Sequence, residues 1–347
     1  SLVGIVEGVP AGIALSEADI QPDLDRRKPG QSEIATPRKE SDAVRILSGT
    51  MDGMTTGAPV AMVIDNEWAT PERIAAYAPE KELAKPGHAT YGYRAKFGPH
   101  RDWIADGRAN GRETAMRVAA GAIARKLLRV EGIEIVGYTQ ALGGVECSPM
   151  RFEDVQSQAE TSIVRCPDPA IAQRMLARAV EVKARGDSIG GVVCVMARGV
   201  PAGWGEPVFG KLDADLARAM MSIGAVKGVE VGAGLSAASM LGSENNDVPF
   251  VDRGVVRFRT NHAGGIVGGI STGADIVVRL AVKPTPTIAA EQDTIDMKSM
   301  TAAKFRCKTA TDPTIVPRLV PIAEAMMALT LADHAMLAKA QSHRKES

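Results

Sequence analysis

Chemically capable residues concentrate in the segment 108–124, RANGRETAMRVAAGAIA. A charged, Gly-rich approach leads directly into a run of small residues, which predicts a helix with a polar start and little bulk along its side. The first turn of a helix leaves N–H groups unpaired and carries the positive end of the helix dipole, which favours anions. Arg108, Arg112 and Arg117 add three cations there. The segment therefore predicts a phosphate or carboxylate site.

Three further stretches place cations, histidine or glycine outside any periodic pattern: the loop 27–40, the Pro-Gly-His turn at 86–88 and the Gly-rich segment 261–287. In the last of these, glycines such as Gly273 permit close backbone approach. Lys283, followed by hydroxyls, offers the groups that a phosphate prefers. We expect these stretches to form one site for a polyanionic ligand. The competing interpretations are Gly-rich strand packing and, for His88, an exposed loop histidine.

Two other sequence patterns each allow a functional interpretation and a competing structural one. Residues 232–237, GAGLSA, follow a strand-like stretch and match the G-x-G-x-x-A dinucleotide fingerprint, although too few residues follow for a crossover helix. Asp312, in TATDPT before the last helix, is a candidate general base, and the alternative is that it caps a turn.

Composition restricts the class of protein. The chain has 347 residues, 45% of them hydrophobic, with 41 basic and 41 acidic residues and 4% aromatics. The balanced charge and the scarcity of aromatic residues disfavour nucleic-acid binding. No apolar run is long enough to span a membrane and no basic leader opens the chain, so we expect a cytoplasmic protein without a membrane partner. Four cysteines without C-x-x-C spacing predict reduced thiols and no metal site.

The first half of the chain alternates predicted strands and helices. A capping box at Ser16 and Asp19 starts a helix that ends near Arg27. Residues 66–113 are the least regular part of the chain, although the charged stretch 70–83, TPERIAAYAPEKEL, resembles a helix. The other elements expected in this half are strands at 2–6, 10–14, 44–47 and 59–64, the last two joined as a hairpin, and a helix at 114–130.

The second half repeats this alternation without a tandem repeat or a linker. Its expected elements are strands at 135–138 and 162–164, within 188–199 and within 222–234, and helices at 167–186, 213–221 and 317–341. We therefore expect a single domain over 1–347, with two interwoven strand and helix halves.

Long motifs along almost the whole chain resemble the chorismate synthase family. They include GVPAGIALSEADIQPDLDRRKPGQ, LSGTMDGMTTGAPVAMVI, KPGHAT, GRETAMRVAAGAIA, GDSIGGVV, GEPVFGKLDADLARAMMSIGAVKGVEVG, NHAGGIVGGISTG, VVRLAVKPTPT and DPTIVPRLVPIAEAMMALTLAD. The resemblance implies an α+β fold, a β-α-β sandwich of the chorismate synthase type with helices packed between antiparallel sheets, assembled as a homotetramer.

The resemblance also implies an activity and a cofactor. The expected reaction is the 1,4-elimination of phosphate from 5-enolpyruvylshikimate 3-phosphate to give chorismate, with reduced FMN and with an external flavin reductase as a partner. It implies that His88 lies near the leaving phosphate and the flavin and that Asp312 manages the proton at flavin N5. The residues expected to bind substrate are Arg27, Arg112 and Lys85. Those expected to bind FMN are Arg108, Asn110, Gly273, Lys283 and Thr287.

This sequence departs from the family pattern at several places. Residues 105–110, ADGRAN, stand for G-G-G-R-S-S; Glu33 stands for arginine, Thr90 for aspartate and 309–311, TAT, for Gly-Arg-His. The family's G-E-S-H-G segment would precede Ser1. These changes leave an alternative, a catalytically impaired scaffold that retains flavin or anion binding. A third hypothesis is an NAD-linked oxidoreductase that uses GAGLSA.

Overall fold

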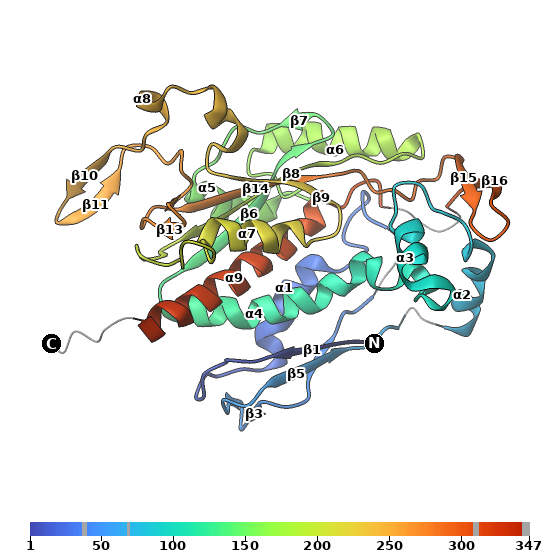
Figure 1. Ribbon diagram of the computed structural model, residues 1–347, viewed down its shortest axis with the longest axis horizontal. Helices are drawn as coiled ribbons and strands as arrows, with labels where there is room; N and C mark the ends of the chain where they lie inside the picture. The colour runs from blue at the N-terminus through green and yellow to red at the C-terminus, as the bar shows by residue number, and fades with distance from the viewer. Residues whose placement is uncertain (37–39, 68–69, 308–311, 342–347) are drawn as a thin grey trace.

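Two long helices, α4 (Thr114–Val130) and α9 (Val316–Gln341), pack against each other at the centre of the protein (Figure 1). The computed structural model describes residues 1–36, 40–67, 70–307 and 312–341. The Ala-rich side of α4 is buried, and a Cβ atom on Gly121 would lie only 2.3 Å from the Cβ of Ala325. Glycine at 121 therefore sets how closely the two helices approach.

These helices form the middle of three layers. On one side lies an antiparallel sheet in the order β1 (Leu2–Val6), β5 (Val60–Ile64), β2 (Val44–Ile46). On the other side lies an antiparallel sheet in the order β7 (Val145–Glu146), β6 (Glu134–Leu142), β8 (Gly191–Arg198), β14 (Ile276–Val282), β9 (Val226–Val231). Helix α4 packs on β1 and α9 packs on β6 and β8, with α1 (Glu17–Arg27) and α7 (Leu212–Met221) beside them. The expected α+β sandwich is confirmed.

The larger sheet is buried on both faces at its centre. Along β8, Val193 and Val195 belong to the main hydrophobic core that includes α4 and α9, whereas Cys194 and Met196 belong to a separate cluster on the opposite face. That second cluster includes residues of α5 (Phe152–Gln158), and α6 (Pro169–Ala184) also packs on this sheet. A strand buried on both sides explains why β8 reads as a continuous apolar run.

Short elements complete the described fold. The remaining helices are α2 (Pro71–Ala76), α3 (Thr90–Phe97) and α8 (Gly242–Asn245). The remaining strands form four hairpins: β3 (Thr50–Met51) with β4 (Met54–Thr55), β10 (Pro249–Asp252) with β11 (Val255–Phe258), β12 (Ile266–Val267) with β13 (Ile270–Ser271), and β15 (Gln292–Asp296) with β16 (Thr301–Phe305). The β10–β11 hairpin projects from the body of the protein at the left of Figure 1.

Some expected elements are wrong. Residues 10–14 form a turn with one isolated bridge, between Ala14 and Met54, and 162–164 form a turn. Within the segment 66–113, the helix-like stretch 70–83 forms α2 and the 3-10 turn η1 (Ala78–Glu80), whereas α3 and further 3-10 turns lie where the sequence predicts no regular element. Apolar alternation over three to five residues is too short to distinguish a strand from a turn, and α3 has no buried residues that could show a period.

The strand topology around residues 232–237 also contradicts the dinucleotide-binding hypothesis. Residues 232–237 lead into η6 (Gly234–Ser239), a 3-10 turn, and the preceding strand β9 pairs antiparallel with β14. A dinucleotide fold requires a parallel β-α-β unit with a full crossover helix at this point. The NAD-linked alternative therefore has no structural basis in this chain.

Helix α9 is the one described helix that is long and apolar enough to cross a membrane by length and composition. Of its most apolar window, 72% is buried inside the protein, and the helix packs against α4, α7, β6 and β8. Its apolar character is thus accounted for by its position in the core.

A buried ion cluster joins the middle layer to α1. Glu324 of α9 is 2% exposed and accepts hydrogen bonds from Arg26 Nη1 at 2.5 Å and Arg125 Nη2 at 2.7 Å. Burial opposes ionisation of Glu324, but the two guanidinium groups outweigh it and lower its pKa to about 2. The carboxylate therefore stays charged and connects three helices.

We predict that Gly121→Ala destabilises the protein. The added methyl group meets the backbone of α9, so we expect the free energy of unfolding to fall by about 1–3 kcal/mol, measured by urea denaturation. Gly92→Ala is the matched control, because Gly92 lies in α3 with nothing within 4 Å of an added Cβ, and it should be neutral or stabilising. Equal losses in both variants would contradict the close-approach argument.

We predict that Glu324→Gln changes the acid stability of the protein. Since the folded-state pKa is lowered to about 2 from 4.5, the stabilisation is present above pH 4.5 and is lost as the pH falls toward 2. The variant should lose about 3–5 kcal/mol near neutral pH and show a flatter stability profile between those values. Glu181→Gln, at exposed pairs with Arg178 and Arg185, should leave the stability and its acid profile close to those of the unsubstituted protein. An unchanged acid profile in Glu324→Gln would refute this assignment.

Candidate active site

The turn that carries His88 contains a buried ammonium group. Lys85 is 8% exposed, and its Nζ lies 3.1 Å from both carboxylate oxygens of Asp106 and 3.3 Å from Glu80. Burial lowers the pKa of Lys85, but the two carboxylates outweigh it and leave the pKa raised. Lys85 is therefore a fixed cation whose charge is already compensated.

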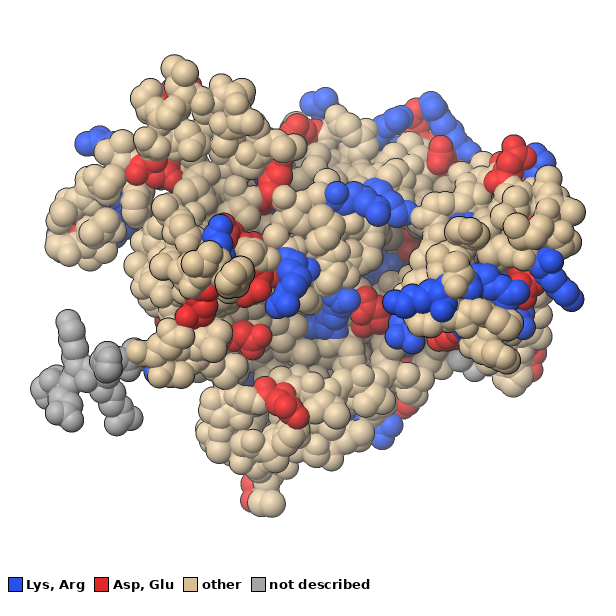
Figure 2. All heavy atoms as spheres, in the orientation of Figure 1, with Lys and Arg blue, Asp and Glu red and all other residues tan. Residues whose placement is uncertain are grey.

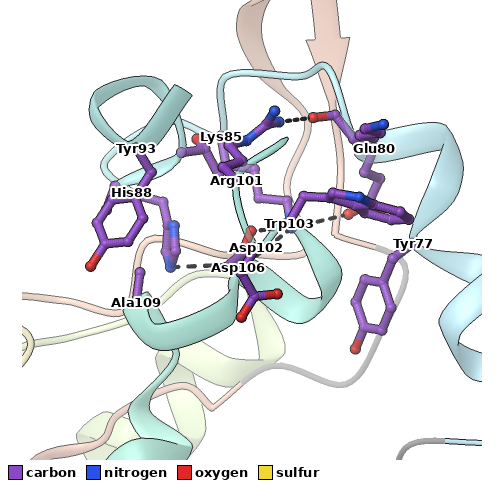
Figure 3. A pocket seen from close by; sticks show the side chains of 13 residues that line it. Tyr77, Glu80, Lys85, His88, Tyr93, Arg101, Asp102, Trp103, Asp106 and Ala109 are labelled. Carbon is purple, nitrogen blue, oxygen red and sulfur yellow. Dashed lines mark hydrogen bonds and ion pairs between the residues drawn. The ribbon is translucent and has the colours of Figure 1, made fainter. Parts of the chain in front are cut away.

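His88 faces the same aspartate. Its Nε2 lies 3.9 Å from Asp106 Oδ2, and its Nδ1 is buried without a hydrogen-bond partner among the described residues. Burial lowers the pKa of His88, as do the charges of Lys85 and Lys283, while Asp106 opposes them. His88, Lys85 and Asp106 line a pocket together with Tyr77, Tyr93 and Trp103 (Figure 3). Burial and the two ammonium groups thus favour the neutral form of the imidazole, whose buried Nδ1 is left without a hydrogen-bond partner in the described part of the chain.

The segment 283–287 lies directly against this turn. Lys283 Nζ donates to the carbonyl of Gly87 at 3.0 Å, and a Cβ on Gly87 would lie 3.2 Å from Pro286 Cβ. The pKa of Lys283 is lowered by burial and by Lys227. Its ammonium has no carboxylate partner in the described part of the chain. Thr285 adds a buried hydroxyl that has no hydrogen-bond partner there.

A second charged cluster lies at the starts of α4 and α9. Asp42, whose side chain is fully buried, accepts hydrogen bonds from Arg27 Nη1 at 2.7 Å and from Arg112 Nη1 at 2.8 Å. Arg112 also pairs with Glu40. Arg27 reaches both helices, because its Nε donates to Thr114 Oγ1 at 3.2 Å and its carbonyl accepts from Arg318 at 3.1 Å. The two helix N-termini thus add partial positive charge near the arginines.

Asp312 lies in this second cluster. One of its oxygens accepts from the backbone N–H of Thr36 at 2.7 Å, and the other pairs with Arg318 at 3.0 Å. The next residue, Pro313, accepts from the N–H of Ile189, and the neighbouring Ser188 Oγ donates to the carbonyl of Thr285 at 2.7 Å. The loop at 188–189 therefore connects the Asp312 cluster to the His88 pocket.

The segment 106–114 joins the two clusters. At one end Asp106 contacts Lys85, and at the other Arg112 contacts Asp42, while Asn110 accepts from the N–H of Arg112 at 2.9 Å. Arg108 lies between them, exposed, with its guanidinium carbon 5.4 Å from the centroid of the Phe97 ring. Most of the residues that sequence analysis singled out are brought to this one end of the protein.

Gly273 lies far from the charged clusters of the same chain. It precedes β14 and Lys283 follows it, so the seven residues of the strand place them roughly 20 Å apart. The structure gives Thr287 a half-buried position two residues after Thr285. Gly273 has a left-handed φ of 89° and lies near Ala202. The glycine at position 273 is therefore explained by the turn that precedes β14.

Sequence reasoning missed the carboxylates that hold the cations. Glu40 and Asp42 follow the basic loop, Glu80 precedes Lys85 by five residues, and Asp106 lies in the Gly-rich approach. It also missed Arg101, which is 6% exposed and lines the pocket with an Nη1 that has no partner among the described residues. For the carboxylates, the only signal in the sequence is an acidic residue close to a predicted ligand-binding cation, a pattern that surface ion pairs also produce.

The charges are balanced over the visible surface as well. Figure 2 shows Lys and Arg side chains gathered over the α2 and α3 region on the right of the view, with acidic side chains among them. No extended field of one sign draws a ligand in from a distance on this face. Recognition of an anion depends on the local groups described above.

The chain is similar to known proteins over almost its whole length. The family model described as chorismate synthase matches residues 1–336. A chorismate synthase from Methanosarcina barkeri is 51% identical over 95% of this chain and 89% of its own length, and one from Archaeoglobus fulgidus is 50% identical over 95% and 90%. A crystal structure of a chorismate synthase superposes with a TM-score of 0.74 at 32% identity, covering 99% of this chain and 90% of the other.

We predict that Asp42→Ala strongly destabilises the protein. Removing this carboxylate leaves two arginines in a buried cluster uncompensated, and alanine is disfavoured at the observed φ of 48°, so we expect a loss of about 3–5 kcal/mol in thermal or urea unfolding. Asp25→Ala is the control, because Asp25 forms a partly exposed pair with Lys28 and should cost less than about 1 kcal/mol. A small loss in Asp42→Ala would show that the cluster is not held by this carboxylate.

Proposed function

The chain belongs to the chorismate synthase family, and we propose that it releases phosphate from 5-enolpyruvylshikimate 3-phosphate by 1,4-elimination to give chorismate, with bound reduced FMN. The observation that carries this proposal is the contact between the His88 turn and the Lys283 segment. His88 and Lys85, whose charge is compensated by carboxylates, line the pocket, and Lys283, which has no carboxylate partner among the described residues, lies against the turn that carries them. That arrangement suits a phosphorylated ligand.

The residues at 283–287 fit the phosphate end of FMN. The ammonium of Lys283 and the unpartnered hydroxyl of Thr285 offer a charge-assisted and a neutral hydrogen bond, and we propose that Thr287 adds a second hydroxyl. When bound, reduced flavin supplies the electron-rich ring that assists loss of phosphate and removal of a substrate hydrogen. We propose that Arg108 and Asn110 complete the cofactor site from the segment 106–114.

His88 manages the charge of the departing phosphate in this proposal. Its pKa is lowered by burial, so the ligand-free imidazole is neutral. Arrival of a phosphate dianion opposes that effect and favours protonation. The imidazolium then donates a hydrogen bond and its proton to the leaving oxygen as the carbon–oxygen bond breaks. Lys85 holds a further positive charge beside the same position.

The second cluster receives the carboxylates of the substrate. Arg27 and Arg112 are held in place by Asp42, and the starts of α4 and α9 add to their positive potential. We propose that Asp312, which is held by Arg318 and by the backbone N–H of Thr36, would accept the proton that the reaction releases at the flavin. Residues 309–311, which differ from the family pattern, lie outside the described residues.

We also propose an oligomeric state, a domain organisation, a cellular compartment and a source of the reduced flavin. The exposed apolar residues Val251, Val255 and Val256 on the projecting β10–β11 hairpin support a homotetramer, because they need a covering surface. The continuous core supports one domain over 1–347. The four free cysteines fit a reducing compartment, the cytoplasm, where an external flavin reductase would supply the reduced cofactor.

One observation favours the alternative of a catalytically impaired scaffold. Lys85, Arg27 and Arg112 are each paired with carboxylates of the same chain, so an anionic ligand meets cations that are already compensated. Such pairing weakens the attraction for a ligand while preserving the fold. Turnover measurements separate this alternative from an active enzyme.

We predict that the chain releases phosphate from 5-enolpyruvylshikimate 3-phosphate anaerobically in the presence of chemically reduced FMN. His88→Gln should lower kcat at least about 100-fold, because it removes the proton donor to the leaving group. His100→Gln is the matched control, since His100 is exposed and is absent from the residues that line the pocket, and it should retain the rate.

Two outcomes would contradict this proposal. Absence of phosphate release, with an established family member active in the same assay, would support the impaired scaffold. A His88→Gln variant as fast as the unsubstituted chain would remove His88 from the mechanism while leaving the reaction itself in place.

A further inference from the structure

Asp106 has an unusual backbone conformation at the edge of the candidate site. Its φ is +64°, within the 3-10 turn η3 (Ile104–Ala109), in the left-handed region that residues other than glycine adopt at a cost. The following Gly107 also has a positive φ, and a Cβ there would lie 2.6 Å from Asp102. This tight turn directs the Asp106 carboxylate toward the Lys85–His88 turn rather than into solvent.

The carboxylate occupies the position where two anion-binding groups converge. Both oxygens lie 3.1 Å from Lys85 Nζ, one lies 3.9 Å from His88 Nε2, and the side chain is 14% exposed (Figure 3). Two oxygens bridging an ammonium and an imidazole reproduce the contacts that a phosphate or carboxylate ligand would make. A ligand oxygen and the Asp106 oxygens therefore compete for the same groups.

We propose that Asp106 is a specificity-determining residue that acts as an internal competitor: its carboxylate binds Lys85 in the ligand-free site, and an incoming phosphate must displace it. This inference rests on the proposed assignment of Lys85 and His88 to the ligand site. It predicts that the chain binds simple phosphate weakly. Only a ligand with further contacts, such as those offered by the arginine cluster, overcomes the competition.

The surrounding charges define what removal of Asp106 does to His88. Lys85 and Lys283 both lower the pKa of His88, as burial does, and Asp106 is the neighbour that raises it. The other charged groups lining the pocket are Glu80, Lys81, Arg101 and Asp102. Replacing Asp106 by a neutral residue should therefore lower the pKa of His88 and leave Lys85 with Glu80 as its remaining carboxylate partner among the described residues, so that the ammonium can also bind a ligand.

The test measures binding of inorganic phosphate by calorimetry to the full chain and to Asp106→Asn, since asparagine tolerates a left-handed backbone. We expect about tenfold tighter binding in the variant, together with a lower pKa of His88 in an NMR titration whose resonance is assigned by its loss in His88→Gln. Asp106→Gly, which accepts the observed φ without strain, should give the same tightening. The matched control Asp102→Asn removes a carboxylate from the same pocket that contacts neither Lys85 nor His88, and should change phosphate affinity less than about threefold.

The proposal is overturned if phosphate binding is unchanged or weaker in both Asp106 variants, which would make the carboxylate a support for Lys85. It is also overturned if Asp102→Asn tightens binding equally, which would indicate a general field effect. Because neither readout requires turnover, these results remain decisive if the chain fails to release phosphate from 5-enolpyruvylshikimate 3-phosphate. Failure of the proposed reaction and failure of this inference are thereby distinguished.

Discussion

The close approach of α4 and α9 is the contact on which the rest of the structure depends. With no side chain at Gly121, the two helices meet backbone to backbone and bury their small residues between two sheets. Both helices begin beside Arg27, so their packing also sets the distance between Arg112, near the start of α4, and Arg318, near the start of α9. The geometry of the arginine cluster therefore follows from the packing of the core.

Carboxylates of the chain hold the site's cations before any ligand arrives. Asp42 separates Arg27 from Arg112, and Asp106 neutralises Lys85. Bringing several cations together without these partners would be unfavourable, because like charges repel strongly in a partly buried setting. The same partners reduce the attraction for an anionic ligand. In the proposed site, the stability of the protein and its affinity for an anion are thus opposed, and the balance is set by the carboxylates that face the cations.

Regular elements with a clear period were predictable from the sequence. The helix at 114–130, the hairpin of β2 with β5 and the capping box at Ser16 follow from local patterns, and the structure confirms them. The turns at 10–14 and 162–164 contain a few alternating residues that resemble a strand, a pattern too short to carry much information. Helix α3 is not predictable from periodicity because none of its residues is buried.

Residue types and local order in the sequence predicted the cationic and histidine residues of the proposed site, and long motifs shared with chorismate synthases predicted the family and, through it, the α+β class. Only the tertiary structure decided which carboxylate faces each cation and that Gly273 lies at the far end of β14 from Lys283. Ion pairs such as Arg27 with Asp42 and Lys85 with Asp106 join segments whose proximity depends on the packing of other elements. Burial and neighbouring charge, which set the protonation of His88, exist only once that packing is complete.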